Sequence, residues 1–195
     1  MSRHTAHLLS IVFNPLFNSI YVFLLLVGAD RDLALERKLA IFCIAFLFSS
    51  VVPMAHVAWL KWRGIIESLD VEQRQRRLLP LIVGILSYAA GYLILFWMQA
   101  PAVVSGLMFC YAANTLLVAI ITRWWKVSIH ATGIAGPIVA LIFRFGWLAV
   151  PLYALVPIIA QARVVLGKHT VWQVVVGACI GTFLTAFQLY YLFHL

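Results

Sequence analysis

Three groups of polar side chains interrupt a very apolar sequence. Each group combines basic residues, and two of the three add side chains that can hydrogen-bond to an anion or exchange a proton. The groups contain Arg74 and Arg77; Lys126, Ser128 and His130; and Arg163, Lys168, His169 and Gln173. Cations, a hydroxyl group and two imidazoles together predict a site that binds a phosphate and reacts at phosphorus.

Phosphoryl transfer explains why these residue types belong together. An arginine side chain holds a phosphate through two parallel hydrogen bonds, and its charge offsets the negative charge of the transition state. Ser128 immediately precedes an apolar run, so its hydroxyl and the first free amides of a helix starting there would complete an anion cradle. One histidine can attack phosphorus while the other protonates the leaving oxygen.

The elements that must position these groups are membrane-spanning helices. Of the 195 residues, 65% are hydrophobic and only 10% are charged, which is more apolar than a soluble domain. Backbone polar groups must be satisfied inside lipid, so long apolar runs require helices. We expect an all-α polytopic helical bundle with seven spans, or six if the region 131–162 is one hairpin broken around Arg144 and Gly146. The apolar segments are approximately 8–29, 39–60, 79–99, 101–122, 131–147, 150–162 and 171–193.

One long polar stretch follows the second span. The sequence KWRGIIESLDVEQRQRRL, residues 61–78, mixes basic and acidic side chains with isolated apolar ones. We expect it to include an amphipathic helix at the membrane surface, with Ile65, Ile66 and Leu69 facing lipid. The chain is therefore predicted to be a single membrane domain. Its parts are two N-terminal spans in 1–62, a polar interfacial segment in 63–78 and a core in 79–195.

The basic residues predict the orientation of the chain. With seven spans, ten of the 14 lysines and arginines fall on the side of the N-terminus and four on the other side. The positive-inside rule makes the first side cytoplasmic in a cell membrane, although arginines that bind a ligand report less on topology. An even number of spans separates each polar group from the next, so all three groups can meet at one membrane face.

The acidic residues disfavour a metal-dependent lipid transferase, because such enzymes hold divalent ions with several carboxylates. The six carboxylates belong to Asp30, Asp32, Glu36, Glu67, Asp70 and Glu72. Three scattered cysteines give no metal-binding spacing either. We expect no metal and no other cofactor. The net charge of +8 indicates contact with anionic lipid headgroups, and not with nucleic acid, because basic residues flank the spans.

The polar groups resemble the motifs of the type 2 phosphatidic acid phosphatase superfamily. The stretch VSIH at 127–130 resembles its PSGH motif, and ARVVLGKHTVWQ at 162–173 resembles its third motif, SR-x5-H-x3-D. The stretch RQRRLLP at 74–80 is a looser match to the first motif, K-x6-RP. The resemblance covers about residues 70–180 and leaves the first two spans outside it.

The resemblance implies a metal-independent lipid phosphatase that works through a phosphohistidine. His169 would be the nucleophile and His130 the general acid, with Gln173 beside His169. The substrate would be a membrane lipid such as phosphatidic acid, phosphatidylglycerophosphate or a polyprenyl phosphate or diphosphate. The residues that would bind the substrate phosphate are Arg163, Ser128, Arg77, Arg74 and Lys126. Lys126 has lipid headgroups as an alternative partner.

The departures from these motifs concern activity most directly. Ala162 stands where the family has serine, and Gln173 stands where it usually has aspartate. Position 173 is four residues after His169, so both side chains share one helix face. A glutamine oxygen can still accept a hydrogen bond from the imidazole, but it brings no charge. Asp70 or Glu72 would be the residue that supplies a carboxylate instead.

Two functions therefore remain open. The first is hydrolysis of a lipid phosphate whose tail enters the site from the bilayer. The second is a protein with a silent site that binds or transports a lipid phosphate without cutting it.

Overall fold

The computed structural model of the chain describes residues 1–71 and 73–195, and these form helices and no strands. The all-α prediction is therefore confirmed for the described part of the chain. Ten α-helices follow one another as α1 (Arg3–Val12), α2 (Pro15–Gly28), α3 (Leu35–Phe46), α4 (Val52–Trp62), α5 (Leu78–Trp97), α6 (Ala102–Thr122), α7 (Ile129–Phe145), α8 (Leu155–Val165), α9 (Val171–Cys179) and α10 (Thr185–Phe193).

Four short helical segments of the described chain continue, connect or precede these helices. Two π-helical segments, Leu47–Val51 and Ile180–Leu184, join α3 to α4 and α9 to α10 without interrupting the helical path. A 3-10 segment, Gly146–Ala154, joins α7 to α8. A further 3-10 turn, Arg74–Arg76, precedes α5.

Within the described residues, five helical segments are long and apolar enough to cross a membrane, or six if α1 and α2, bent by 51° at residues 13–14, count as one span. This is one fewer than the six or seven predicted, because Ile129–Val165 is one continuous helical segment by this criterion. The length and composition of these helices are those of an integral membrane protein. The five are Leu35–Trp62, Arg74–Trp97, Ala102–Thr122, Ile129–Val165 and Val171–Phe193.

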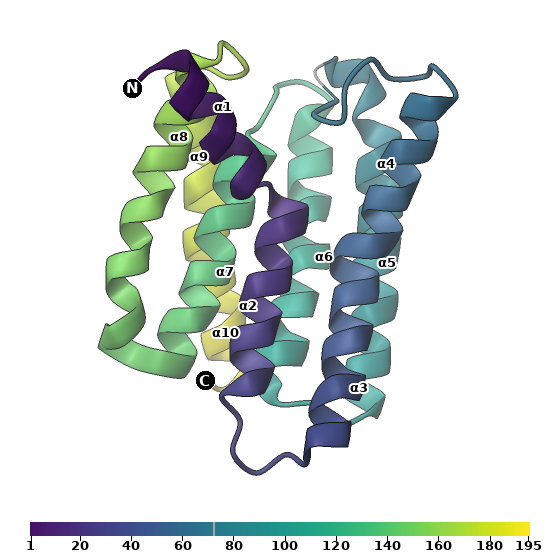
Figure 1. The fold of residues 1–195 in the computed structure, drawn as a ribbon, viewed down its shortest axis with the longest axis vertical. Helices are drawn as coiled ribbons and strands as arrows, with labels where there is room; N and C mark the ends of the chain where they lie inside the picture. Colours follow the sequence, from purple (N-terminus) through teal and green to yellow (C-terminus); the bar gives the residue numbers. More distant parts are fainter. Residues whose placement is uncertain (72) are drawn as a thin grey trace.

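The segment Ile129–Val165 folds back on itself. The chain reverses at Gly146, whose φ of 60° lies in the region that glycine adopts readily. Helices α7 and α8 then pack against each other and run in opposite directions (Figure 1). The alternative of a hairpin broken near Gly146 is therefore the one that the structure adopts.

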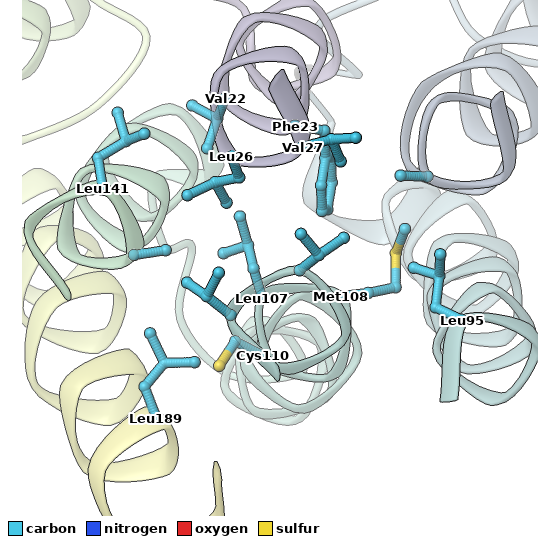
Figure 2. Close-up of a cluster of buried hydrophobic side chains, with 14 of the residues drawn as sticks. Val22, Phe23, Leu26, Val27, Leu95, Leu107, Met108, Cys110, Leu141 and Leu189 are labelled. Carbon is cyan, nitrogen blue, oxygen red and sulfur yellow. The ribbon is translucent and has the colours of Figure 1, made fainter. Parts of the chain in front are cut away.

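The hydrophobic core lies where α2 and α6 cross the other helices (Figure 2). Phe23 and Leu26 of α2 and Leu107 of α6 are fully buried there. Side chains from α5, α7 and α10 complete the cluster. Because so much apolar surface is removed from solvent here, the core fixes the positions of the helix ends that carry the polar residues.

The three polar groups gather at one end of the molecule. The connections 63–73, 123–128 and 166–170 all lie at the end where the chain begins, and the C-terminus lies at the opposite end (Figure 1). The structure thus has the arrangement that the even number of intervening spans predicted. The predicted amphipathic helix in 61–78 is wrong. Helix α4 ends at Trp62, the described residues 63–71 and 73 form turns, bends and irregular structure, Arg74–Arg76 form a 3-10 turn, and α5 starts only at Leu78.

Ile66 explains why this connection is not a surface helix. Ile65 and Leu69 are exposed as expected, but Ile66 is buried against Leu60 and Val71. This small cluster folds the connection back onto the end of α4. The segment is therefore packed against the end of α4 and does not form a surface helix.

Candidate functional site

Four of the predicted site residues line one cavity at the polar end of the bundle. Arg77, His130, Arg163 and His169 all face it, together with Asp70 of the connection 63–73. The cavity has a volume of about 130 Å³, several times the roughly 30 Å³ of one water molecule. Its other walls are largely apolar and come from α2, α4, α5 and α6. The same cavity is therefore lined by charged side chains on one part of its wall and by apolar side chains on the rest.

The two histidines are brought together by close packing of α7 on α9. The backbone N–H of Ser128 donates to the carbonyl of Gln173 at 3.1 Å, and the hydroxyl of Thr132 donates to the carbonyl of Gly177 at 2.9 Å. Gly177 permits this approach, since a Cβ atom there would lie 2.6 Å from the Ser128 carbonyl oxygen. The first turns of the two helices are thus held at a fixed separation.

His169 is oriented by Gln173. Its Nδ1 lies 3.0 Å from Oε1 of Gln173. The same oxygen accepts from the backbone N–H of Thr170 at 3.3 Å, as part of a capping box that starts α9. A backbone N–H can only donate, so it directs the amide oxygen, not the NH2 group, toward His169. Nδ1 then carries the hydrogen, and Nε2 keeps its lone pair.

The surroundings of His169 keep its imidazole neutral. Burial lowers the pKa of His169 to about 3. The positive charges of Arg77, Lys126 and Arg163 act in the same direction. The hydrogen bond to Gln173 opposes them only in part. At neutral pH the lone pair on Nε2 is therefore available to an electrophile.

Arg163 is buried at the wall of the cavity, with 1% of its surface exposed. Its Nη2 pairs with Oδ2 of Asp70 at 3.0 Å, and its Nη1 donates to the hydroxyl of Ser10. Its Nε is buried without a partner among the described residues. An unpaired charged donor beside a cavity is expensive unless an anion or water meets it.

Asp70 serves Arg163 and not His169. Burial is the largest single influence and favours the neutral carboxyl. Attraction to Arg163, His130 and Lys168, together with the hydrogen bond from Arg163, outweighs burial and holds the pKa of Asp70 below its ordinary value of 3.8. Asp70 was a candidate to supply His169 with the carboxylate that Gln173 lacks. In the structure its ion-pair partner is Arg163, and the partner of His169 is Gln173. Glu72, the other candidate, lies outside the described residues.

Ser10 is a site residue that the motifs did not reveal. Its carbonyl oxygen lies 3.3 Å from Nε2 of His130, and its hydroxyl accepts from Arg163. It belongs to α1, outside the part of the chain that resembles the phosphatase motifs. The bend between α1 and α2, with Asn14 capping α2, places it there. A serine inside an apolar run was the only signal in the sequence.

The two arginines predicted in the first motif differ in their relation to the cavity, which Arg77 lines and Arg74 does not. Arg77 is buried, and its guanidinium donates to the carbonyls of Val71 and Val127 at 2.7 and 3.3 Å. Arg74 is not among the lining residues; it reaches the carbonyl of Arg123 at 3.0 Å.

Two further residues predicted to bind the phosphate instead make hydrogen bonds to backbone groups. Lys126 donates to the carbonyl of Lys168 at 2.8 Å, which ties the connection 123–128 to the loop that carries His169. Ser128 is fully buried, and its hydroxyl caps α7 by accepting from the N–H of Ala131 at 3.3 Å. Neither residue is among those that line the cavity.

No family model, characterised protein or solved structure matches the chain. The function of this site therefore has to be argued from its own geometry.

Proposed function

We propose that the protein hydrolyses a lipid phosphate, or a lipid diphosphate, through a phosphohistidine on His169. The orientation of His169 carries the proposal. Its Nδ1–H is held by Gln173, and its neutral ring lines a cavity with His130, Arg77 and Arg163. A neutral imidazole with a free Nε2, next to two guanidinium groups, is what attack on a bound phosphate requires.

The proposed reaction has two steps. In the first, Nε2 of His169 attacks phosphorus, the bond from phosphorus to the lipid oxygen breaks, and His130 gives that oxygen a proton. In the second, water attacks the phosphohistidine, the P–N bond breaks, and the proton released by water returns to His130. Nε2 of His130 faces the carbonyl of Ser10, which only accepts. In the proposed first step His130 is therefore the imidazolium ion, with the bound phosphate as its counter-charge. Its Nε2–H stays on the Ser10 carbonyl, and Nδ1 gives the proton and later regains it.

The proposed roles of the cations are to hold and neutralise the phosphate. Arg163 offers its unpartnered Nε at the cavity wall. Arg77, at the start of α5 and anchored through two carbonyls, offers a second fixed positive charge. Fixed charges cost no reorganisation during the reaction, so they favour the transition state.

The test is release of phosphate from phosphatidic acid and from a polyprenyl diphosphate by the purified protein in the presence of a chelator. We expect turnover that is lost, by at least about a thousandfold, in His169→Gln and falls about a hundredfold or more in His130→Gln. His4→Gln, at an exposed histidine of α1, is the control and should leave the rate unchanged. Label from the substrate phosphate should appear on the wild-type protein in an alkali-stable, acid-labile form. Turnover that survives His169→Gln would refute the proposal.

A lipid-phosphate-binding or transport protein is the second candidate. One observation favours it: both guanidinium groups also have partners within the protein, Arg163 with Asp70 through Nη2 and Arg77 with carbonyl oxygens. Binding of these lipids with no release of phosphate, in wild type as in His169→Gln, is the result that this candidate predicts.

A further inference from the structure

A second cavity extends from the phosphate site into the interior of the bundle. It has a volume of about 60 Å³. It adjoins the first cavity, because five residues belong to the lining of both. These residues are Pro15, Leu81, Tyr88, Thr115 and Ile129. A lipid whose phosphate lies at His169 could therefore place part of its backbone or tail in this inner cavity.

The inner cavity has polar atoms that nothing in the described protein satisfies. Asn114 is 4% exposed; its Nδ2 donates to the hydroxyl of Thr185 at 2.8 Å, but its Oδ1 has no partner. The hydroxyl of Tyr111 is likewise buried without a partner in the part of the chain that the structure describes. Both residues line the inner cavity. Buried polar groups are normally hydrogen-bonded, since leaving them unpaired costs free energy.

Two rare backbone features position side chains at this cavity. Ser49, which lines it, belongs to the π-helical segment Leu47–Val51. Thr185, which fixes the Asn114 amide, directly follows the π-helical segment Ile180–Leu184. Single π-helical turns are uncommon in helices and occur frequently at functional sites. Their presence on two separate spans points to the same place as the unpartnered atoms.

We propose that the inner cavity binds a hydroxyl group of the lipid, so that the protein selects hydroxyl-bearing lipid phosphates over lipids whose tail is hydrocarbon alone. The proposal rests on the proposed function for the position of the phosphate. A hydroxyl both donates and accepts, so it can donate to Oδ1 of Asn114 and accept from Tyr111. A polyprenyl chain would leave both atoms buried and unpaired, and discrimination by unpaired polar groups is strong.

The depth of the site fits a group a few bonds from the phosphate. Gly136 packs next to the Asn114 amide, with a Cβ there 3.9 Å from Nδ2. Gly136 follows His130 by six residues on α7, which corresponds to about 9 Å along the helix axis. The hydroxyl of a monoacylglycerol phosphate or of a sphingoid-base phosphate is four or five bonds from phosphorus, which by itself is shorter than this distance. Hydrogen bonds of about 3 Å at each end make up the difference, whereas a polyprenyl phosphate has no hydroxyl to place there.

The experiment compares a monoacylglycerol phosphate with its deoxy analogue, in which hydrogen replaces the glycerol hydroxyl. Binding of each is titrated in detergent to the His169→Gln protein, so that turnover does not interfere. The same titrations are made with Asn114→Leu and Tyr111→Phe added singly. Tyr92→Phe, at a tyrosine that lines neither cavity, is the matched control. Hydrolysis of both probes by the protein with His169 intact is measured in parallel.

We expect the deoxy analogue to bind about tenfold more weakly than the hydroxyl-bearing probe. The ratio should fall to about one in Asn114→Leu and in Tyr111→Phe, and should persist in Tyr92→Phe. If Asn114→Leu does not fold, Tyr111→Phe, which removes one oxygen atom, decides the question.

Equal binding of the two probes, or a ratio that survives both substitutions, overturns the hydroxyl site even if both probes are hydrolysed. A preserved binding preference without hydrolysis of either probe supports the hydroxyl site and refutes the phosphatase. The two proposals can therefore fail separately.

Discussion

At the scale of single residues, the replacement of a carboxylate by Gln173 changes what supports the proposed nucleophile. A glutamine in this position can enforce the wrong tautomer if its NH2 group faces the imidazole, as happens when an amide replaces the acid of a protease triad. Here the capping box at Thr170 fixes the amide, and its oxygen faces Nδ1 of His169. The hydrogen bond that orients the ring is kept. Burial and the nearby positive charges, not a carboxylate, keep the ring neutral.

Gln173→Leu should separate positioning from folding. We expect kcat/KM for a lipid phosphate to fall about a hundredfold, because Nδ1 of His169 loses its hydrogen-bond acceptor and the ring is no longer held in its orientation. Gln173→Glu keeps an oxygen at the same reach and should restore most of the rate. Gln161→Leu, at an exposed glutamine of α8, should have no effect. Equal losses in the Leu and Glu variants would contradict a positioning role.

The protonation of His169 gives a prediction about pH. Its pKa of about 3 lies below the ordinary value of 6.5, so the folded protein keeps the ring neutral where the unfolded chain takes up a proton. Stability is therefore lost as the pH falls from about 6.5 toward 3, and is unaffected by this group above that range. An NMR titration of labelled histidine, with the His169 signal assigned by His169→Gln, should show no midpoint between pH 5 and 8. A midpoint near 6.5 would count against the proposed environment.

At the scale of elements, the contact between α7 and α9 decides whether the site exists. Each of these helices carries one of the two histidines just inside or just before its first turn. Gly177 and Gly181 let them approach, since a Cβ at either position would lie 2.6 Å from a carbonyl oxygen of α7 or its cap. The glycine pair that could have indicated a dimer interface is used within one chain.

Gly177→Ala should therefore weaken both the fold and the site. Alanine normally favours a helix by up to about 1 kcal/mol over glycine, but here its methyl group meets the Ser128 carbonyl. We expect the free energy of unfolding to fall by about 1–3 kcal/mol, with a larger proportional loss of activity. Gly28→Ala, where a Cβ would meet nothing within 4 Å, is the control. A thermal unfolding midpoint that is equal or higher in Gly177→Ala would disprove this packing role.

At the scale of the whole molecule, the cavity lies at one end of an apolar bundle and is bounded by both charge and hydrocarbon. Tryptophans stand exposed at both ends, with Trp62, Trp124 and Trp172 near the site and Trp97 and Trp147 at the far end. Such belts are typical of the two membrane interfaces. The site thus lies at the level expected for lipid headgroups. A lipid bound there would keep its tail in the bilayer.

Impermeant thiol labelling of a cysteine-free protein in sealed vesicles tests this topology. Gln75→Cys, at the site end, and Asp32→Cys, at the other end, occupy exposed positions. We expect one to react from outside and the other only after the membrane is opened, and the distribution of lysine and arginine predicts that Gln75→Cys faces the cytoplasm. Labelling of both from the same side would contradict a membrane-spanning bundle whose two ends, seen at the top and bottom of Figure 1, lie on opposite sides of the bilayer.

Much of this arrangement could be predicted from the sequence, because its causes are local. Apolar runs of the required length predict helices that cross a membrane, and the parity of spans brings the three polar groups to one end. The spacing of His169 and Gln173 predicts their contact, and the structure has that contact. The contact is not on one helix face, because His169 lies before the N-cap of α9. Features that depend on residues close together in the sequence can be predicted without knowing how the helices pack.

What only the tertiary structure decided depends on contacts between distant parts of the chain. Ser10 meets Arg163 across 153 positions and His130 across 120, and nothing in the spacing of residues foretells such a meeting. Burial of Ile66 turned an expected surface helix into a folded connection, and that fold delivered Asp70 to Arg163 instead of His169. Of two arginines in one motif, only Arg77 reached the cavity. Local sequence sets which helices form, but the burial of apolar surface between them sets which polar side chains finally face one another.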